Sequence, residues 1–255
     1  MKHDDVYSMK PRTQQTRPTI GLLLDWLTGG FQVELWHSVT EYCEQQDVNL
    51  VCFIGGILHG HRDVDVPCNV LYDLAGADNV DGLIISATLG GRCSLADMAA
   101  FCQRYQPLPV VTVAVQLPGI PAVLTDNYQS MRRIVTHLLD DHGCRRIGFY
   151  RKTEGIQDAD ERYRAYVETL AAYDIPLNPD FIVPGQYYLD AAGGISLLLD
   201  ERRLRPRRDL EALIVVDDYL VQELLPIFQA RDIRVPDDLA VTGFDDEEQG
   251  RLLFP

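Results

Sequence analysis

Short apolar runs recur along the chain, and segments with helical periodicity separate them. The runs are continuous rather than alternating, which is typical of parallel strands covered on both faces. They predict seven strands, at Thr19–Leu24, Asn49–Ile54, Asp81–Ser86, Pro109–Ala114, Arg146–Tyr150, Ala212–Val216 and Leu239–Gly243.

Three of the intervening segments place apolar residues at helical spacing. These residues are Phe31, Leu35, Val39 and Tyr42 in the first segment, Met131, Ile134, Val135, Leu138 and Leu139 in the second, and Tyr163, Tyr166, Val167 and Leu170 in the third. We interpret each stripe as the core-facing side of a helix. The second helix is expected to stop at Gly143, because glycine adopts the left-handed conformation that commonly ends helices.

Repeated alternation of strands and helices predicts an α/β fold with mainly parallel sheets. The strands form two clusters, which suggests two lobes, an N-terminal one at 18–142 and a C-terminal one at 143–255. Residues 1–17 are polar and rich in Lys, Arg, Gln and Thr, so we expect a disordered tail there.

Composition narrows the possible roles of the chain. Its apolar fraction of 46% is enough for a real core, and its net charge of −15 disfavours direct binding to nucleic acid. The six cysteines form no C-x-x-C pair, and we interpret them as reduced thiols. With no hydrophobic signal region and no run long enough to cross a membrane, we expect a cytoplasmic protein without a membrane partner.

Most motifs with a known chemistry are missing from the sequence. No G-x-G-x-x-G follows a strand, no G-x-S-x-G is present, and Gly55–Arg62 lacks the residues of a phosphate loop. We therefore expect no cofactor, no metal and no catalytic residue. The carboxylate pairs Asp217-Asp218 and Asp245-Asp246 follow strands, at the edge where open α/β sheets bind ligands. That position fits binding and catalysis equally well.

Several segments, in order, carry a more specific signal. They are Val80-Asp81-Gly82-Leu83-Ile84, Thr125-Asp126-Asn127, His137-Leu138, Gly143 with Arg146-Ile147, Arg162 with Ala165-Tyr166, Val216-Asp217-Asp218, and Arg234 to Val241 followed by Gly243-Phe244-Asp245-Asp246. Together they resemble the ligand-sensing, periplasmic-binding-protein-like domain of LacI/GalR regulators. The similarity runs from about Arg17 to Pro255.

The resemblance implies two hinged α/β lobes of periplasmic-binding-protein-like type I with a ligand in the cleft between them. Arg162 matches a ligand-clamping arginine and Asp245 a carboxylate that accepts ligand hydroxyls. Tyr187 matches an aromatic that stacks on the ligand, and Asp217 stands where the family usually has asparagine. Asp25 and the aromatic Phe31 follow the first strand and complete the expected ligand site. We expect six residues to converge there: Asp25, Phe31, Arg162, Tyr187, Asp217 and Asp245.

The chain also departs from the family pattern. The helix-turn-helix headpiece would precede the first strand, but only a short polar tail stands there. The family continues beyond the equivalent of Pro255 into a final helix and strand, so we expect a C-terminally truncated second lobe. The DNA-binding partner or output domain would then lie outside this chain.

The partner expected from the resemblance is a small molecule. Three acids against one arginine favour a ligand that is neutral and hydroxyl-rich, or cationic, over a phosphate. A homodimer is compatible with the same interpretation.

Two other functions share some of these features. A free sugar-binding transport protein would have the same fold but should carry a signal peptide. A glycoside hydrolase could use the carboxylates near the cleft. Turnover of chromogenic glycosides that Asp245→Asn abolishes would favour the hydrolase.

Overall fold

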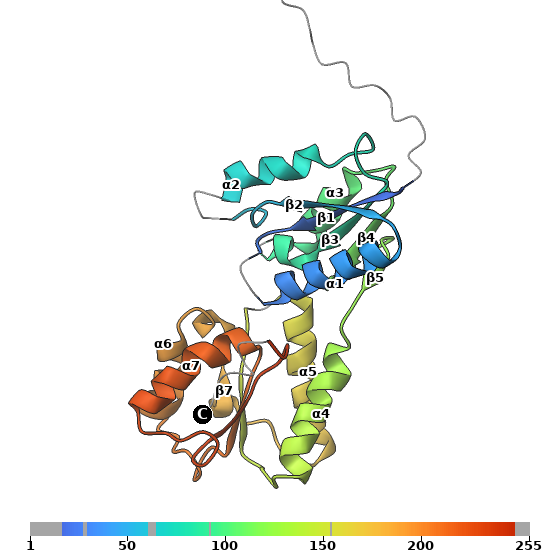
Figure 1. Ribbon diagram of the computed structural model, residues 1–255. Helices are drawn as coiled ribbons and strands as arrows, with labels where there is room; N and C mark the ends of the chain where they lie inside the picture. Colours follow the sequence, from blue (N-terminus) through green and yellow to red (C-terminus); the bar gives the residue numbers. More distant parts are fainter. Residues whose placement is uncertain (1–16, 28–29, 61–64, 92, 154, 248–255) are drawn as a thin grey trace, which may run out of the picture. The chain divides into compact units, whose positions relative to one another are not determined.

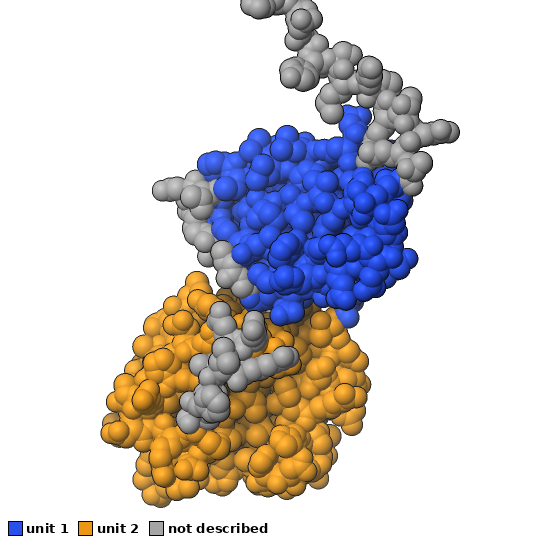
Figure 2. Space-filling view, in the orientation of Figure 1, with its two compact units in different colours: residues 1–124 blue, residues 125–255 orange. Residues whose placement is uncertain are grey.

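A computed structural model describes residues 17–27, 30–60, 65–91, 93–153 and 155–247. The chain forms two compact units, Met1–Leu124 and Thr125–Pro255 (Figure 2). The division falls earlier than the boundary near residue 142 that the strand clusters suggested, because the helix after Leu124 packs within the second unit. The expected N-terminal tail lies almost wholly outside the described residues.

The first unit contains a parallel five-stranded sheet in the order β2-β1-β3-β4-β5. Its strands are β1 (Thr19–Leu24), β2 (Asn49–Ile54), β3 (Gly82–Ser86), β4 (Val110–Val113) and β5 (Ala122–Val123). The helices are α1 (Phe31–Gln45), α2 (Asp65–Cys68) and α3 (Leu95–Gln103), with short helical turns η1 (Asn69–Leu74) and η2 (Ala87–Gly90). Right-handed crossovers place α1 and α2 on opposite faces of this sheet (Figure 1).

The second unit contains a parallel four-stranded sheet in the order β7-β6-β8-β9. Its strands are β6 (Ile147–Tyr150), β7 (Ile182–Val183), β8 (Ala212–Val215) and β9 (Ala240–Thr242). The helices are α4 (Asn127–Asp140), α5 (Gln157–Ala172), α6 (Ala191–Ser196) and α7 (Asp218–Ala230), and the short turns are η3 (Pro179–Phe181), η4 (Gly185–Tyr187) and η5 (Leu197–Glu201). The pair α4 and α5 covers one face of the sheet, and α6 and α7 cover the other (Figure 1).

All seven predicted strands are present within one residue of their expected ends. The two strands that the sequence did not predict, β5 and β7, are two residues long. Each forms an edge of its sheet. A pair of apolar residues is too short to give a periodic signal, so hydrophobic patterning does not find them.

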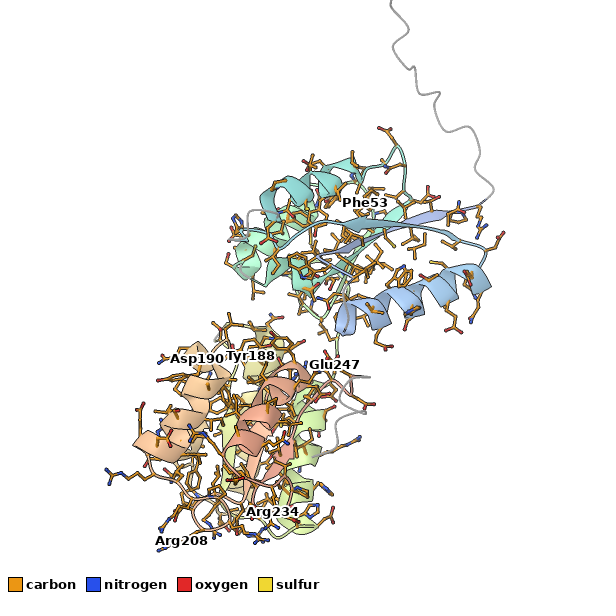
Figure 3. The ribbon with its side chains drawn as sticks, turned by 60° about the vertical axis from the view of Figure 1, so that its left-hand side comes forward. Phe53, Tyr188, Asp190, Arg208, Arg234 and Glu247 are labelled. Carbon is orange, nitrogen blue, oxygen red and sulfur yellow. The ribbon has the colours of Figure 1, made fainter. Side chains whose placement is uncertain are left out.

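Each unit has its own apolar core. In the second unit, Met131, Val135 and Leu138 of α4 and Tyr166 and Leu170 of α5 are buried against the sheet, as their stripes predicted. In the first unit Phe53 of β2 belongs to a cluster of buried residues from β1, β3 and α3 (Figure 3). The two cores account for the fold as two separately packed α/β layers.

The first predicted stripe differs from the other two. Phe31 and Tyr42 of α1 are 37% and 64% exposed, and Cys43 is the buried residue of this helix. The expectation that the whole stripe faces the core is therefore wrong at both ends. The helix packs mainly on β2, the edge strand of the sheet, which offers less apolar surface than a central strand would.

Candidate functional site

Polar side chains gather where the parallel strands of the second unit end. Lys152 follows β6, Asp217 follows β8, and Phe244 and Asp245 follow β9. Because these strands are parallel, their carboxyl ends share one edge of the sheet. Figure 3 shows Tyr188 and Glu247 at one end of this unit and Arg208 and Arg234 at the other.

Arg162 of α5 makes three side-chain hydrogen bonds at this edge and is only 8% exposed. Its Nε donates to Oδ1 of Asn127 at 2.8 Å, its Nη1 to the carbonyl oxygen of Val216 at 2.7 Å, and its Nη2 to Oδ1 of Asp245 at 3.0 Å. The guanidinium also lies 3.7 Å above the centre of the Phe244 ring. Three hydrogen bonds and a ring fix this cation in one orientation.

The loop that carries Asp245 has an unusual backbone. Asp245 and Asp246 have φ angles of 97° and 54°, a region that residues other than glycine rarely adopt. Asp218 holds the loop, because its backbone N–H donates to the carbonyl oxygen of Phe244 at 2.9 Å and its Oδ2 accepts from the N–H of Glu247 at 3.0 Å. Backbone in sparsely populated regions clusters at ligand sites, where the surrounding structure maintains it.

Asp217 is buried and has three donors. Its Oδ1 accepts from the backbone N–H of Leu220 at 3.1 Å, so it caps the N-terminus of α7. Its Oδ2 accepts from Nζ of Lys152 at 3.0 Å and from the hydroxyl of Tyr188 at 2.8 Å. The Lys152 ammonium also lies 4.7 Å from the centre of the Tyr188 ring. These contacts satisfy a carboxylate that would otherwise be costly to bury.

Four acidic side chains at this edge have pKa values above the ordinary ones. Burial raises the pKa of Asp158, Asp218, Asp245 and Glu247, and neighbouring carboxylates raise it further in each case. Arg162 partly opposes this effect on the pKa of Asp158 and of Asp245. Acidic side chains at this edge therefore outweigh the basic ones.

This arrangement predicts that stability depends on pH through Asp245. Its raised pKa means that the folded protein keeps a proton at pH values above the ordinary 3.8, where the unfolded chain has lost it. The contribution of Asp245 to the free energy of unfolding should therefore decrease as pH rises from about 4 toward neutrality. Urea unfolding at several pH values should show a shallower decrease in Asp245→Asn than in the parent. An identical pH slope in both proteins would contradict the prediction.

The first unit has a smaller polar group at the equivalent edge of its sheet. Asp25, which follows β1, is 3% exposed and accepts from Oγ1 of Thr88 at 2.7 Å and from Nε2 of Gln32 at 3.2 Å. The Thr88 hydroxyl is in turn 2.9 Å from that of Ser86, the last residue of β3. Phe31 begins α1 and is 37% exposed. The carboxylate of Asp25, the hydroxyl of Thr88 and the exposed ring of Phe31 therefore follow β1, β3 and β1 respectively.

The six residues expected to form one site divide between the units. Within the second unit, Arg162 and Asp245 are directly bonded. Asp217 is bonded to Lys152 and Tyr188 at the same edge of the sheet. Asp25 and Phe31 belong to the first unit. The convergence of all six on one ligand stays a prediction.

Tyr187 lies next to this network, and its expected stacking on a ligand stays a prediction. Its carbonyl oxygen accepts from the Tyr150 hydroxyl at 2.9 Å, and its side chain packs against the core. The next residue, Tyr188, is the aromatic that contacts Lys152 and Asp217.

Sequence reasoning did not assign a role in the site to Lys152, Tyr188, Asn127, Phe244 or Asp218. Two signals could have indicated some of them. Lys152 stands two residues after the predicted strand Arg146–Tyr150, close to the position of Asp217, which directly follows the predicted strand Ala212–Val216. Asn127 and Phe244 lie inside the quoted motifs, but their side-chain partners are distant in sequence and only the fold reveals them.

Within the part of the chain that the structure describes, no group of three or more His, Cys, Asp or Glu side chains is placed to hold a metal ion. None of the described helices has the length and apolar character needed to span a membrane.

Comparison with known proteins gives consistent results. Residues 135–255 match the model of the periplasmic binding protein-like domain. The HTH-type transcriptional repressor PurR of Photobacterium profundum is 26% identical over 245 residues, which cover 94% of this chain and 68% of that protein. The ribose operon repressor of Haemophilus influenzae is 27% identical over 242 residues, covering 93% and 67%.

A solved structure agrees with these matches. A putative transcriptional regulator of the LacI family from Sanguibacter keddieii superposes with a TM-score of 0.71 and 26% identity, covering 93% of this chain and 80% of that one. The fold and these comparisons define a periplasmic-binding-protein-like, ligand-binding architecture. These matches support the resemblance to ligand-binding domains of the LacI/GalR type that the sequence motifs carry.

Proposed function

We propose that this chain senses a small hydroxyl-rich ligand, neutral or cationic, and passes the signal to transcriptional control. The observation that carries the proposal is the bonded pair of Arg162 and Asp245 at the carboxyl edge of the second sheet. The pair combines a buried, oriented donor with a carboxylate on a backbone of positive φ. Such a pair suits a ligand better than it suits simple packing.

The pair has the hydrogen-bonding capacity that hydroxyl groups need. A hydroxyl donates one hydrogen bond and accepts others, so it can donate to Asp245 and accept from Arg162. Charged partners make such bonds stronger than neutral ones. Phe244 and Tyr188 add aromatic surface beside these charges, which suits the apolar faces of a sugar-like ring.

The charge balance at this edge argues against a phosphate ligand. Arg162 and Lys152 stand against five acids, which are Asp158, Asp217, Asp218, Asp245 and Glu247. An anion brought here would meet net repulsion, whereas an ammonium group would relieve the repulsion among the carboxylates. A sugar, a polyol, an amino sugar or a nucleoside fits this charge pattern.

Thermal-shift screening is the test of this proposal. Pentoses, hexoses, polyols, amino sugars and nucleosides would be compared with sugar phosphates at equal concentration. A ligand present at about 100 times its Kd stabilises the folded state by about 2.7 kcal/mol, which raises the midpoint by several degrees. The proposal predicts such a rise for at least one compound without a phosphate. Stabilisation by sugar phosphates alone would contradict it.

Regulation is the role supported by the matches to two named repressors. We place the protein in the cytoplasm on the same ground. A homodimer stays a prediction that light scattering can test.

Hydrolysis is the less favoured alternative, since Asp217 caps α7, pairs with the Lys152 ammonium and accepts a hydrogen bond from the Tyr188 hydroxyl. Release of chromophore from aryl glycosides, lost in Asp245→Asn, would reverse this preference.

A further inference from the structure

Two histidines meet at the end of α4, away from the edge that carries Arg162. His137 lies in the last turn of the helix, and His142 follows its final residue. Asn127, which bonds to Arg162, begins the same helix. A rise of 1.5 Å per residue puts His137 roughly 15 Å along the helix from Asn127. The two features are therefore separate in space.

The way α4 ends brings the two rings together. The backbone N–H of Asp141 still bonds to the carbonyl oxygen of His137 at 3.0 Å, so the helical course continues past Asp140. Gly143 then adopts a φ of 67°, and the N–H of Cys144 returns to the carbonyl oxygen of Leu138 at 2.9 Å. This turn holds His142 against the last turn of the helix.

The ring nitrogens are close enough to share one ligand. Nε2 of His137 is 3.1 Å from Nε2 of His142, and the ring planes are inclined at 89°. Two imidazole nitrogens that bind one metal ion at 2.0–2.1 Å are about 2.9 Å apart at a right angle and about 3.4 Å apart at a tetrahedral angle. The observed separation falls between these values.

Asp141 gives His137 the tautomer that a metal ligand needs. Its Oδ2 lies 2.6 Å from Nδ1 of His137, and a carboxylate there accepts the Nδ1 proton. That leaves the lone pair of His137 Nε2 directed at His142. A carboxylate behind a coordinating histidine is the usual second shell of metal sites, where it orients the ring and raises its basicity.

We propose that His137 and His142 bind a divalent transition metal ion, with Zn²⁺ as the representative ion, and that Asp141 positions His137 for it. On metal binding, His142 takes the tautomer that carries its one proton on Nδ1, so the Nε2 lone pairs of both rings face the ion and no proton is lost. Two imidazoles leave the other coordination positions to water, since the described residues provide no third His, Cys, Asp or Glu ligand. Imidazole ligands favour Zn²⁺, Ni²⁺ and Cu²⁺ over Mg²⁺ and Ca²⁺.

Calorimetric titration of ZnCl₂ into the full chain tests this site. We expect binding that His137→Ala and His142→Ala each weaken at least tenfold. Asp141→Asn should weaken it by about tenfold or more, because the second-shell bond is lost while both ligands remain. MgCl₂ should give no comparable heat.

His37→Ala is the matched control, because His37 is an exposed histidine on α1 in the other unit. Its Zn²⁺ affinity should equal that of the parent. Circular dichroism would confirm that each variant is folded, and Co²⁺ absorption bands that vanish in both histidine variants would confirm direct ligation. Zn²⁺ affinity unchanged in both His137→Ala and His142→Ala, or no Zn²⁺ binding by the parent at millimolar concentration, would overturn the proposal.

Discussion

Arg162→Ala is expected to lower the free energy of unfolding by about 2–4 kcal/mol, because it removes a buried cation that makes three hydrogen bonds. The substitution leaves Asp245, Asn127 and the Val216 carbonyl without the donor that each has in the parent. Asp245 would also lose the cation that counteracts the rise in its pKa. Urea denaturation followed by circular dichroism measures the change.

Arg164→Ala is the matched control for this experiment. Arg164 lies on the same helix, but its side chain is 57% exposed and its contact with Glu161 is 3.9 Å long. Exposed pairs of this kind are worth about 0–1 kcal/mol, so the control should stay within that range of the parent. Equal losses in Arg162→Ala and Arg164→Ala would show that the bonding network of Arg162 contributes little.

The same substitution should also weaken ligand binding. Without the guanidinium, carboxylates and ligand hydroxyls in the complex lack a hydrogen-bond donor. This should reduce the binding free energy by roughly 2–4 kcal/mol, or about one and a half to three decades of affinity. Arg162→Lys keeps the positive charge but loses the planar, multiply bonded geometry, so it too should bind more weakly than the parent. A folded Arg162→Lys variant with full affinity would contradict the role assigned to the guanidinium.

Tyr150→Ala is expected to cost about 3–5 kcal/mol, the usual range for removing a large buried aromatic ring. Tyr150 ends β6, is fully buried and fills the space beside Gly194. Its hydroxyl donates toward the carbonyl oxygens of Tyr187 at 2.9 Å and Asp190 at 3.3 Å. It therefore anchors the segment that presents Tyr188 to Asp217.

Tyr150→Phe distinguishes the contribution of the ring to stability from that of the hydroxyl. It keeps the packing and should cost only about 1–3 kcal/mol, the penalty for leaving a buried carbonyl without its donor. Chemical denaturation of both variants gives the comparison. A loss in Tyr150→Phe as large as that in Tyr150→Ala would show that the hydrogen bond, and not the packing, dominates at this position.

The fold of this protein was largely predictable because its signals are local and repeated. The apolar runs around β1, β6 and β8 are continuous, and those strands are buried on both faces as such runs indicate. The apolar stripe of α1 is an exception to this agreement. Periodicity identifies the helix but cannot reveal that it packs on an edge strand and leaves Tyr42 exposed.

The candidate site was predictable only in part. Arg162, Asp217 and Asp245 were found because each stands in a motif or directly after a strand. Lys152 and Tyr188 were missed because their bonds to Asp217 span 65 and 29 positions of sequence. Tyr187 and Tyr188 are adjacent and both pack partly against the core, so only the bond from the Tyr188 hydroxyl to Asp217 distinguishes the two rings.

Calorimetric titration of the best ligand from the thermal-shift screen into the parent and into Asp245→Asn tests the central claim most directly. Losing the charge of a carboxylate that accepts ligand hydroxyls should cost about 1.5–3 kcal/mol, or roughly ten- to 150-fold in affinity. Asp237→Asn, at an exposed position of the same unit, should bind like the parent. We predict a loss of affinity confined to Asp245→Asn, and equal affinity in the parent and a folded Asp245→Asn variant would contradict a ligand-binding role of Asp245.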